Sequence, residues 1–281
     1  MEYLDAYDAV LARWPIPVES VDVPSVYGTT RVHVCGPDRG TPLVLLHGRG
    51  ATSTVWFRNV AELSRDRRVY ALDQLGDAGR SVHDGQPLAG LADLMAWLDT
   101  VLVYLNLDRV HLAGHSYGAW LALSYTLHVP DRVAKLALLD PTKCFGGYRI
   151  GYLLHAIPLF ARPSAARMRA FLDWESRGAA LDPGWRRVME LGVEVPTSKV
   201  VLPRRPPAVR LRAGAVPTLV LVAERSRSNN VPRITATARR LLPDVRVQVL
   251  PGVSHHMIPT EHADQLNRAL VGFLAAGTAA L

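Results

Sequence analysis

The sequence has little cysteine, little lysine and no long apolar run. Cys35 and Cys144 are the only cysteines in 281 residues, which excludes a disulfide framework and the repeated cysteine spacing of a zinc site. Lysine occurs at three positions, so the net charge of +7 comes from scattered arginines, and no compact basic stripe predicts nucleic-acid binding. The chain has neither an apolar run of about 18 residues nor a secretory signal. We expect no membrane span, no metal, no nucleic acid and a cytoplasmic location.

Short apolar runs alternate with longer helical patterns, which is typical of a mostly parallel sheet with crossover helices. We expect eight strands, at 20–24, 31–35, 43–47, 68–73, 110–114, 134–140, 218–224 and 246–250. Helices are expected at 54–63, 88–105, 117–128, 232–242 and 262–275, and the acidic first residues resemble a short amphipathic helix. The first two strands should pair antiparallel at one edge of the sheet. The fold class is therefore α/β.

The alternation breaks between residues 140 and 216. This stretch has helix-like segments rich in aromatic residues and then the proline-rich Pro203-Arg-Arg-Pro-Pro207. Such an insertion lies over the carboxyl ends of the strands, where open parallel sheets bind ligands. We expect a core formed by residues 1–141 and 214–281 and a helical cap at 142–213.

The segment Gly114-His-Ser-Tyr-Gly118 joins an expected strand to an expected helix. A serine at the apex of such a turn is held in a strained backbone and exposed, so that its hydroxyl can attack a carbonyl. The flanking glycines provide the small side chains that a sharp turn between strand and helix requires. Ser116 is the candidate nucleophile.

Several motifs together resemble the α/β-hydrolase family over nearly the whole chain. They are 43–49 with Trp56 following, 70–81, 114–118, 217–224 and 251–257. Within that family the chain is similar to bacterial carboxylesterase-like members with a helical cap. The resemblance implies the α/β-hydrolase fold, with an eight-stranded sheet flanked by helices, and a chain order of nucleophile, acid and histidine.

A serine hydroxyl is a weak nucleophile unless a base lies within hydrogen-bond distance. The resemblance implies a histidine base in the loop after the last strand; counted from the turn at 251–252, His255 falls on the family's catalytic position, and its neighbour His256 is the alternative. The resemblance also implies an oxyanion hole, which we assign to the backbone N–H groups of Arg49 and Tyr117. The Arg49 side chain is either a surface group or a ligand for an acidic group of the substrate.

The acid of the triad departs from the family pattern. The usual carboxylate position, two residues after Glu224, is occupied here by Ser226. Asp140, directly after the strand that follows the nucleophile strand, is the expected replacement because some α/β-hydrolases take their acid from that strand end. Glu224, or a dyad without any acid, is the alternative.

We expect a serine hydrolase that cleaves a carboxylic ester or related acyl compound through an acyl-enzyme on Ser116. No cofactor is needed, and the aromatic residues of the cap favour a small hydrophobic or aromatic acyl substrate. The missing acid at residue 226 leaves open a lyase or cyclase acting on a secondary metabolite, and the fold leaves open a ligand-binding pseudo-hydrolase. A homodimer is one option for the oligomeric state.

Overall fold

The structure, a computed structural model, describes residues 2–275. Its centre is an eight-stranded sheet with the order β1-β2-β4-β3-β5-β6-β7-β8. The strands are β1 (Glu19–Ser25), β2 (Gly28–Cys35), β3 (Leu43–Leu46), β4 (Val69–Leu72), β5 (Val110–His115), β6 (Val133–Leu139), β7 (Thr218–Ala223) and β8 (Val245–Leu250). All eight predicted strands are present, which confirms the mostly parallel sheet. β1 and β2 form the predicted antiparallel pair at one edge, and β2 is also antiparallel to β4.

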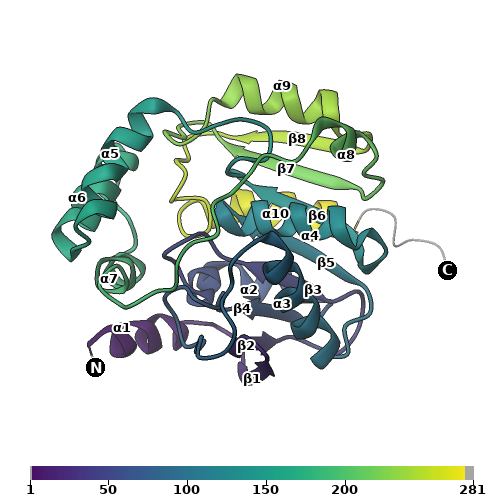
Figure 1. The fold of residues 1–281 in the computed structure, drawn as a ribbon, viewed down its shortest axis with the longest axis horizontal. Coiled ribbons are helices and arrows are strands. Elements are labelled where there is room, and N and C mark those ends of the chain that lie inside the picture. The colour runs from purple at the N-terminus through teal and green to yellow at the C-terminus, as the bar shows by residue number, and fades with distance from the viewer. Residues whose placement is uncertain (1, 276–281) are drawn as a thin grey trace.

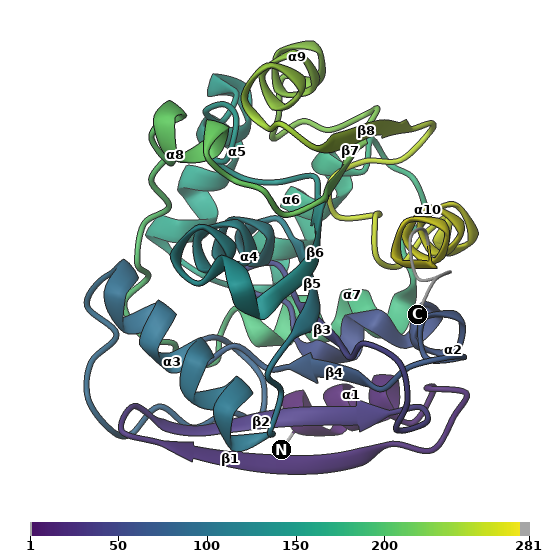
Figure 2. The same cartoon turned by 90° about the vertical axis from the view of Figure 1, so that its right-hand side faces the viewer.

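Helices cover both faces of the sheet, as Figure 2 shows with α3 and α4 on one side and α2 and α10 on the other. The helices outside the β6–β7 connection are α1 (Glu2–Leu11), α2 (Val60–Leu63), α3 (Leu91–Tyr104), α4 (Tyr117–His128), α9 (Val231–Leu241) and α10 (Ala263–Ala275). The helix expected over 54–63 is instead a 3₁₀ segment, η1 (Ser53–Arg58), followed by α2, and a second 3₁₀ turn, η2 (Pro130–Arg132), precedes β6.

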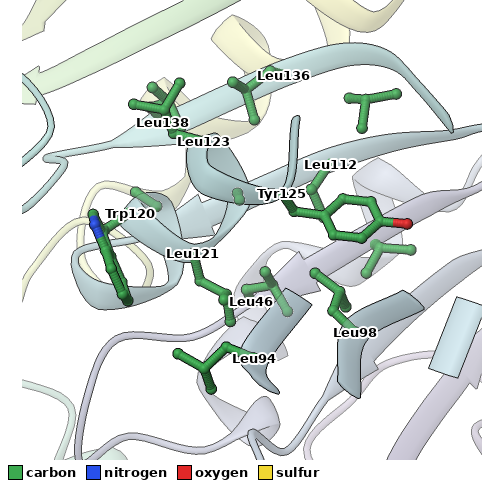
Figure 3. Close-up of a cluster of buried hydrophobic side chains, with 14 of the residues drawn as sticks. Leu46, Leu94, Leu98, Leu112, Trp120, Leu121, Leu123, Tyr125, Leu136 and Leu138 are labelled. Carbon is green, nitrogen blue, oxygen red and sulfur yellow. The ribbon is translucent and has the colours of Figure 1, made fainter. Parts of the chain in front are cut away.

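Helix α4 is buried on nearly all sides, because it lies directly behind the central strands. Its Trp120, Leu121 and Leu123 pack in one apolar cluster with Leu112 of β5 and Leu138 of β6 (Figure 3). A buried apolar helix of this kind fixes the position of its own first residue. That residue follows Ser116, so the packing of α4 also fixes the candidate nucleophile.

Four helices lie between β6 and β7. They are α5 (Ile150–Ala161), α6 (Ala165–Glu175), α7 (Pro183–Gly192) and α8 (Ala208–Arg212). Figure 1 shows α5, α6 and α7 at one side of the molecule, away from the sheet. Among residues 2–275, no helix has the length and apolar character that crossing a membrane requires.

Candidate active site

Ser116 is the single residue between β5 and α4, and its backbone has φ 54° and ψ −112°. This is a strained region for a residue with a side chain. The glycines on either side allow the turn to be tight. A Cβ atom at Gly114 would lie 2.2 Å from the carbonyl oxygen of Gly118, and one at Gly118 would lie 2.4 Å from the carbonyl oxygens of Leu46 and His47. No larger residue fits either position.

The loop after β8 brings an imidazole to this serine. His255 Nε2 lies 2.8 Å from Ser116 Oγ, whereas His256 Nδ1 lies 3.2 Å from a carboxylate oxygen of Glu175. Ser116 Oγ is also 3.0 Å from the hydroxyl of Thr142. The structure therefore brings His255, and not its neighbour, to the candidate nucleophile.

The Asp140 carboxylate lies on the other side of the imidazole. Its Oδ2 is 2.6 Å from His255 Nδ1, and the side chain is fully buried. Asp140 follows β6 with a φ of 39°, and its backbone N–H donates to Leu221 of β7 at 2.7 Å. This bond across the parallel pair turns the carboxylate toward the end of β7, where the N–H of Ala223 donates to Oδ1 at 3.2 Å.

Ser226 occupies the position where the family pattern has its acid, and its hydroxyl donates to Asp140 Oδ2 at 2.7 Å. The Ser228 hydroxyl lies 3.2 Å from His255 Nδ1 and 3.4 Å from the same carboxylate oxygen. Hydroxyl donors of this kind stabilise an ionised carboxylate. The alternative acid, Glu224, instead accepts from the backbone N–H of Gly252 at 2.8 Å.

Burial and charge act in opposite directions on His255. Burial alone lowers the pKa of the imidazole, but the hydrogen bond and negative charge of Asp140, with the charge of Glu175, together raise the pKa above its ordinary value. A raised pKa means that the protonated form is stabilised. This is the form that His255 would adopt after accepting a proton from Ser116.

His115, the residue before the nucleophile, packs against His255. Its ring centroid lies 4.8 Å from that of His255, and its Nε2–H donates to the carbonyl of His255 at 2.9 Å. Burial, with the neighbouring imidazoles of His255 and His256, lowers the pKa of His115 well below its ordinary value. His115 therefore remains neutral and supports the backbone of the loop after β8, which carries His255 and His256.

Glu175, the last residue of α6, is a buried carboxylate that the sequence reasoning missed. It accepts from the backbone N–H of His255 at 2.9 Å, from that of His256 at 3.2 Å and from the hydroxyl of Ser254 at 2.8 Å. Burial opposes its ionisation, but the hydrogen bond and charge of the His256 imidazole, the charge of His255 and the Ser254 hydroxyl together lower the pKa of Glu175 to about 2. No sequence motif marks this residue, because its partners, both backbone and side-chain groups, lie about 80 positions further along the chain.

The loop after β3 approaches the other side of Ser116. A Cβ atom at Gly48 would lie 3.3 Å from the Cβ of Ser116. Among the described residues, no acceptor is bonded to the backbone N–H of Arg49 or of Tyr117, the two groups predicted for the oxyanion hole. The Arg49 guanidinium lies 3.6 Å from the Asp77 carboxylate and donates to Thr197 at 3.2 Å, so this side chain has partners within the protein.

Two aromatic residues of the β6–β7 connection contact the loop that carries His255 and His256. The Tyr152 ring lies 6.2 Å from His255 and 5.4 Å from Phe171, and the Tyr148 ring stacks on Tyr152 at 5.6 Å. Phe171 lies 5.7 Å from His256. The side of the site next to the imidazole is therefore largely aromatic. Within residues 2–275, no cluster of three or more histidine, cysteine or acidic side chains could hold a metal ion.

The sequence matches the alpha/beta hydrolase family over residues 43–269. The chain belongs to this family. A curated relative from Bacillus subtilis (strain 168), the uncharacterized carboxylesterase nap, is 28% identical over 99% of this chain and 94% of its own length. Among solved structures, carboxylesterase CesB (YbfK) from B. subtilis has a TM-score of 0.91 at 26% identity and covers 98% of both chains. Naproxen esterase (carboxylesterase NP) from B. subtilis has a TM-score of 0.89 at 27% identity over 97% of this chain and 96% of its own.

The similarities to these relatives extend over 97–99% of the chain. They confirm the predicted α/β-hydrolase fold and the predicted resemblance to bacterial carboxylesterases.

Proposed function

We propose that this protein is a serine carboxylesterase that cleaves its substrate through an acyl-enzyme on Ser116. The observation that carries this proposal is the continuous hydrogen-bonded chain from Ser116 Oγ through His255 to Asp140, with distances of 2.8 and 2.6 Å. Full-length relatives that are named carboxylesterases support the same reaction class. In this proposal, residues 142–213 form the cap over the core.

The mechanism follows from the geometry. His255 Nε2 accepts the hydroxyl proton as Ser116 Oγ bonds to the ester carbonyl carbon, and the N–H groups of Arg49 and Tyr117 donate to the oxyanion. Tyr117 begins α4, so the partial positive charge of the helix N-terminus favours the same anion. The imidazolium then protonates the departing alcohol, which breaks the ester C–O bond. Water, deprotonated by His255, hydrolyses the acyl-enzyme and regenerates Ser116.

Asp140 has two roles in this scheme. It accepts from Nδ1–H, which leaves Nε2 free to accept the serine proton, and its negative charge stabilises the imidazolium. The non-hydrolytic lyase or cyclase alternative rested on the absence of an acid at Ser226. A carboxylate from a neighbouring strand end now accounts for that absence, so the alternative is not favoured.

The substrate that suits this site is a small ester with a hydrophobic or aromatic acyl group. Tyr152, Phe171 and the stacked Tyr148 provide apolar ring faces beside His255. A similar protein of solved structure is a naproxen esterase, which is consistent with an aromatic preference. The cytoplasmic location and the homodimer stay predictions.

A fluorophosphonate probe combined with p-nitrophenyl esters tests the proposal. We expect rapid labelling of wild-type protein at Ser116, no labelling of Ser116→Ala, and loss of turnover in that variant by roughly 10⁴-fold or more. Among the esters, phenylacetate should have a higher kcat/KM than acetate. Absence of labelling together with tight binding of an apolar ligand would instead indicate a pseudo-hydrolase.

A further inference from the structure

Helix α5 exposes an unusual amount of apolar surface. Its exposed large apolar side chains, with the exposed fraction of each, are Ile150 (76%), Leu153 (44%), Leu154 (60%), Ile157 (56%) and Phe160 (74%). Five such side chains on one 12-residue helix form a contiguous face, unlike the single exposed apolar residues that are normal on protein surfaces. We call these five residues the outer face of α5.

The outer face is separate from the side of α5 that packs on the protein. Ala156 and Leu159 are buried, and Tyr152 points toward His255. The spacing of the five outer residues places them within about a third of the helix circumference. A helix with one partner normally has polar residues opposite its buried side, but α5 contains no charged residue. A helix without charged residues is typical of one that is in contact with other groups on two opposite sides.

Positive charge surrounds the outer face. Residues 141–172 contain five basic residues and no aspartate or glutamate. Arg149 and Arg162 flank the two ends of α5. In the described part of the chain, neither they nor Arg167 forms a salt bridge, although Arg169 pairs with Glu190 at 2.8 Å. The acidic group at the C-terminal end, Glu194, accepts from the backbone N–H of Ala165 at 2.9 Å.

We propose that the outer face of α5 docks on an anionic lipid surface. An apolar helix face flanked by arginines fits the boundary between acyl chains and negatively charged headgroups. There the apolar side chains contact the acyl chains while the arginines bind the headgroups. A second copy of the chain fits less well, because pairing the same face would bring two sets of unpaired arginines together. Figure 1 shows α5 at the outer edge of the molecule, where a flat surface could approach it.

Docking in this way would bring the lipid surface close to the candidate active site. Tyr152 projects from the same helix to within 6.2 Å of His255, measured between ring centroids, so a single helix separates the docked surface from the catalytic imidazole. Binding itself does not depend on the esterase proposal, so the two can be tested separately.

The test is co-sedimentation of the full-length Ser116→Ala protein with phosphatidylcholine vesicles, with and without phosphatidylglycerol. The serine variant avoids hydrolysis of the lipid. We expect binding only to the vesicles that contain phosphatidylglycerol, and weaker binding as salt is raised. Adding Ile157→Ser and Phe160→Ser should weaken binding by about tenfold each, and Arg149→Gln with Arg162→Gln should weaken it by about fivefold per arginine.

Val26→Ser is the matched control, because Val26 is 62% exposed but lies in the turn between β1 and β2. It should bind vesicles like the parent protein. In the presence of Ser116, Ile157→Ser with Phe160→Ser should retain hydrolysis of a water-soluble ester, which shows that the fold is intact.

Two results would overturn the proposal. One is equal sedimentation, or none, for the parent protein and the α5 variants. The other is a concentration-dependent dimer, seen by analytical ultracentrifugation, that the α5 substitutions dissociate without any effect on lipid binding. The outer face would then be a contact between copies of the chain.

Discussion

The carboxylate of Glu175 accepts a hydrogen bond from the backbone N–H of His255 at 2.9 Å, although the two residues are 80 positions apart. Its second oxygen accepts from Ser254 and His256. One buried side chain of α6 thus fixes three consecutive residues of the loop that carries the candidate base. Because a triad functions only when the imidazole is placed to within a fraction of an ångström, we expect Glu175 to affect the reaction without contacting substrate.

Glu175→Gln should lower kcat by about tenfold and leave KM nearly unchanged, because the amide retains an acceptor for only part of the loop. Since the charge of Glu175 contributes to raising the pKa of His255, the acid limb of the kcat/KM profile should also move to lower pH. Asp173→Asn is the matched control, since Asp173 is exposed on the same helix and pairs with Arg186 at 2.8 Å. A variant with reduced kcat but an unchanged pH profile would contradict the electrostatic part of this role.

Glu175 should also contribute to stability in a defined pH range. Its pKa falls from 4.5 to about 2 on folding, so the native state favours the ionised form. The resulting stabilisation is complete above pH 4.5, about 3 kcal/mol at most, and it is lost as pH falls toward 2. Urea unfolding of wild type and Glu175→Gln should therefore give free energies of unfolding whose difference is largest at pH 6, smaller at pH 3, and lost only as the pH approaches 2. A constant difference across this range would show that the ionisation of Glu175 is not involved.

Asp140→Asn should change the pH dependence of hydrolysis as well as its rate. Only neutral His255 accepts a proton, so kcat/KM falls as pH drops through the pKa of His255 in the free enzyme. In wild type this midpoint should lie above 6.5, because Asp140 raises the pKa, and in the variant it should lie lower because burial then dominates. The rate at the optimum should fall by roughly 10³–10⁴-fold. An unchanged midpoint would argue against contact between the two groups in solution.

The carboxylate that contacts His255 should function from residue 226, after β7, as well as from residue 140, after β6. Ser226 Oγ lies 2.7 Å from Asp140 Oδ2, so an aspartate at residue 226 could place an oxygen close to His255 Nδ1. We expect the double variant Asp140→Asn with Ser226→Asp to hydrolyse esters at least about tenfold faster than Asp140→Asn alone. In the wild-type background, Ser226→Asp should reduce activity, because two carboxylates would then share one buried site. Failure of the double variant, with its fold confirmed by circular dichroism, would mean that the loop of Ser226 cannot carry the acid.

The sequence predicted those features that follow from local patterns. The eight strands are short apolar runs, and Ser116 lies in a turn whose glycines are required by backbone contacts of 2.2 to 2.4 Å. Asp140 could be proposed because of the family resemblance, since some α/β-hydrolases take their acid from the end of this strand. The structure shows why this position can serve: β6 and β7 are parallel neighbours and end at the same edge of the sheet.

Features that depend on side-chain packing could not be predicted in this way. Glu175 ends an ordinary helix, and nothing in its local sequence indicates that it is buried against a loop 80 residues away. The contact of His115 with His255 also depends on how the loop after β8 packs against the end of β5, which no local pattern predicts. In both cases the partners lie far along the chain and include backbone groups, which are present at every residue and leave no signal in the sequence.

The position of Glu175 restricts how this enzyme could be re-engineered. Its backbone belongs to the β6–β7 connection, while its carboxylate completes the loop of the core that holds His255. An exchange of the β6–β7 connection for that of a relative would therefore remove Glu175. The loop that holds His255 would lose this carboxylate at the same time as the residues beside the substrate change. Such chimaeras should retain their kcat only when the inserted segment places a carboxylate at the backbone N–H of His255.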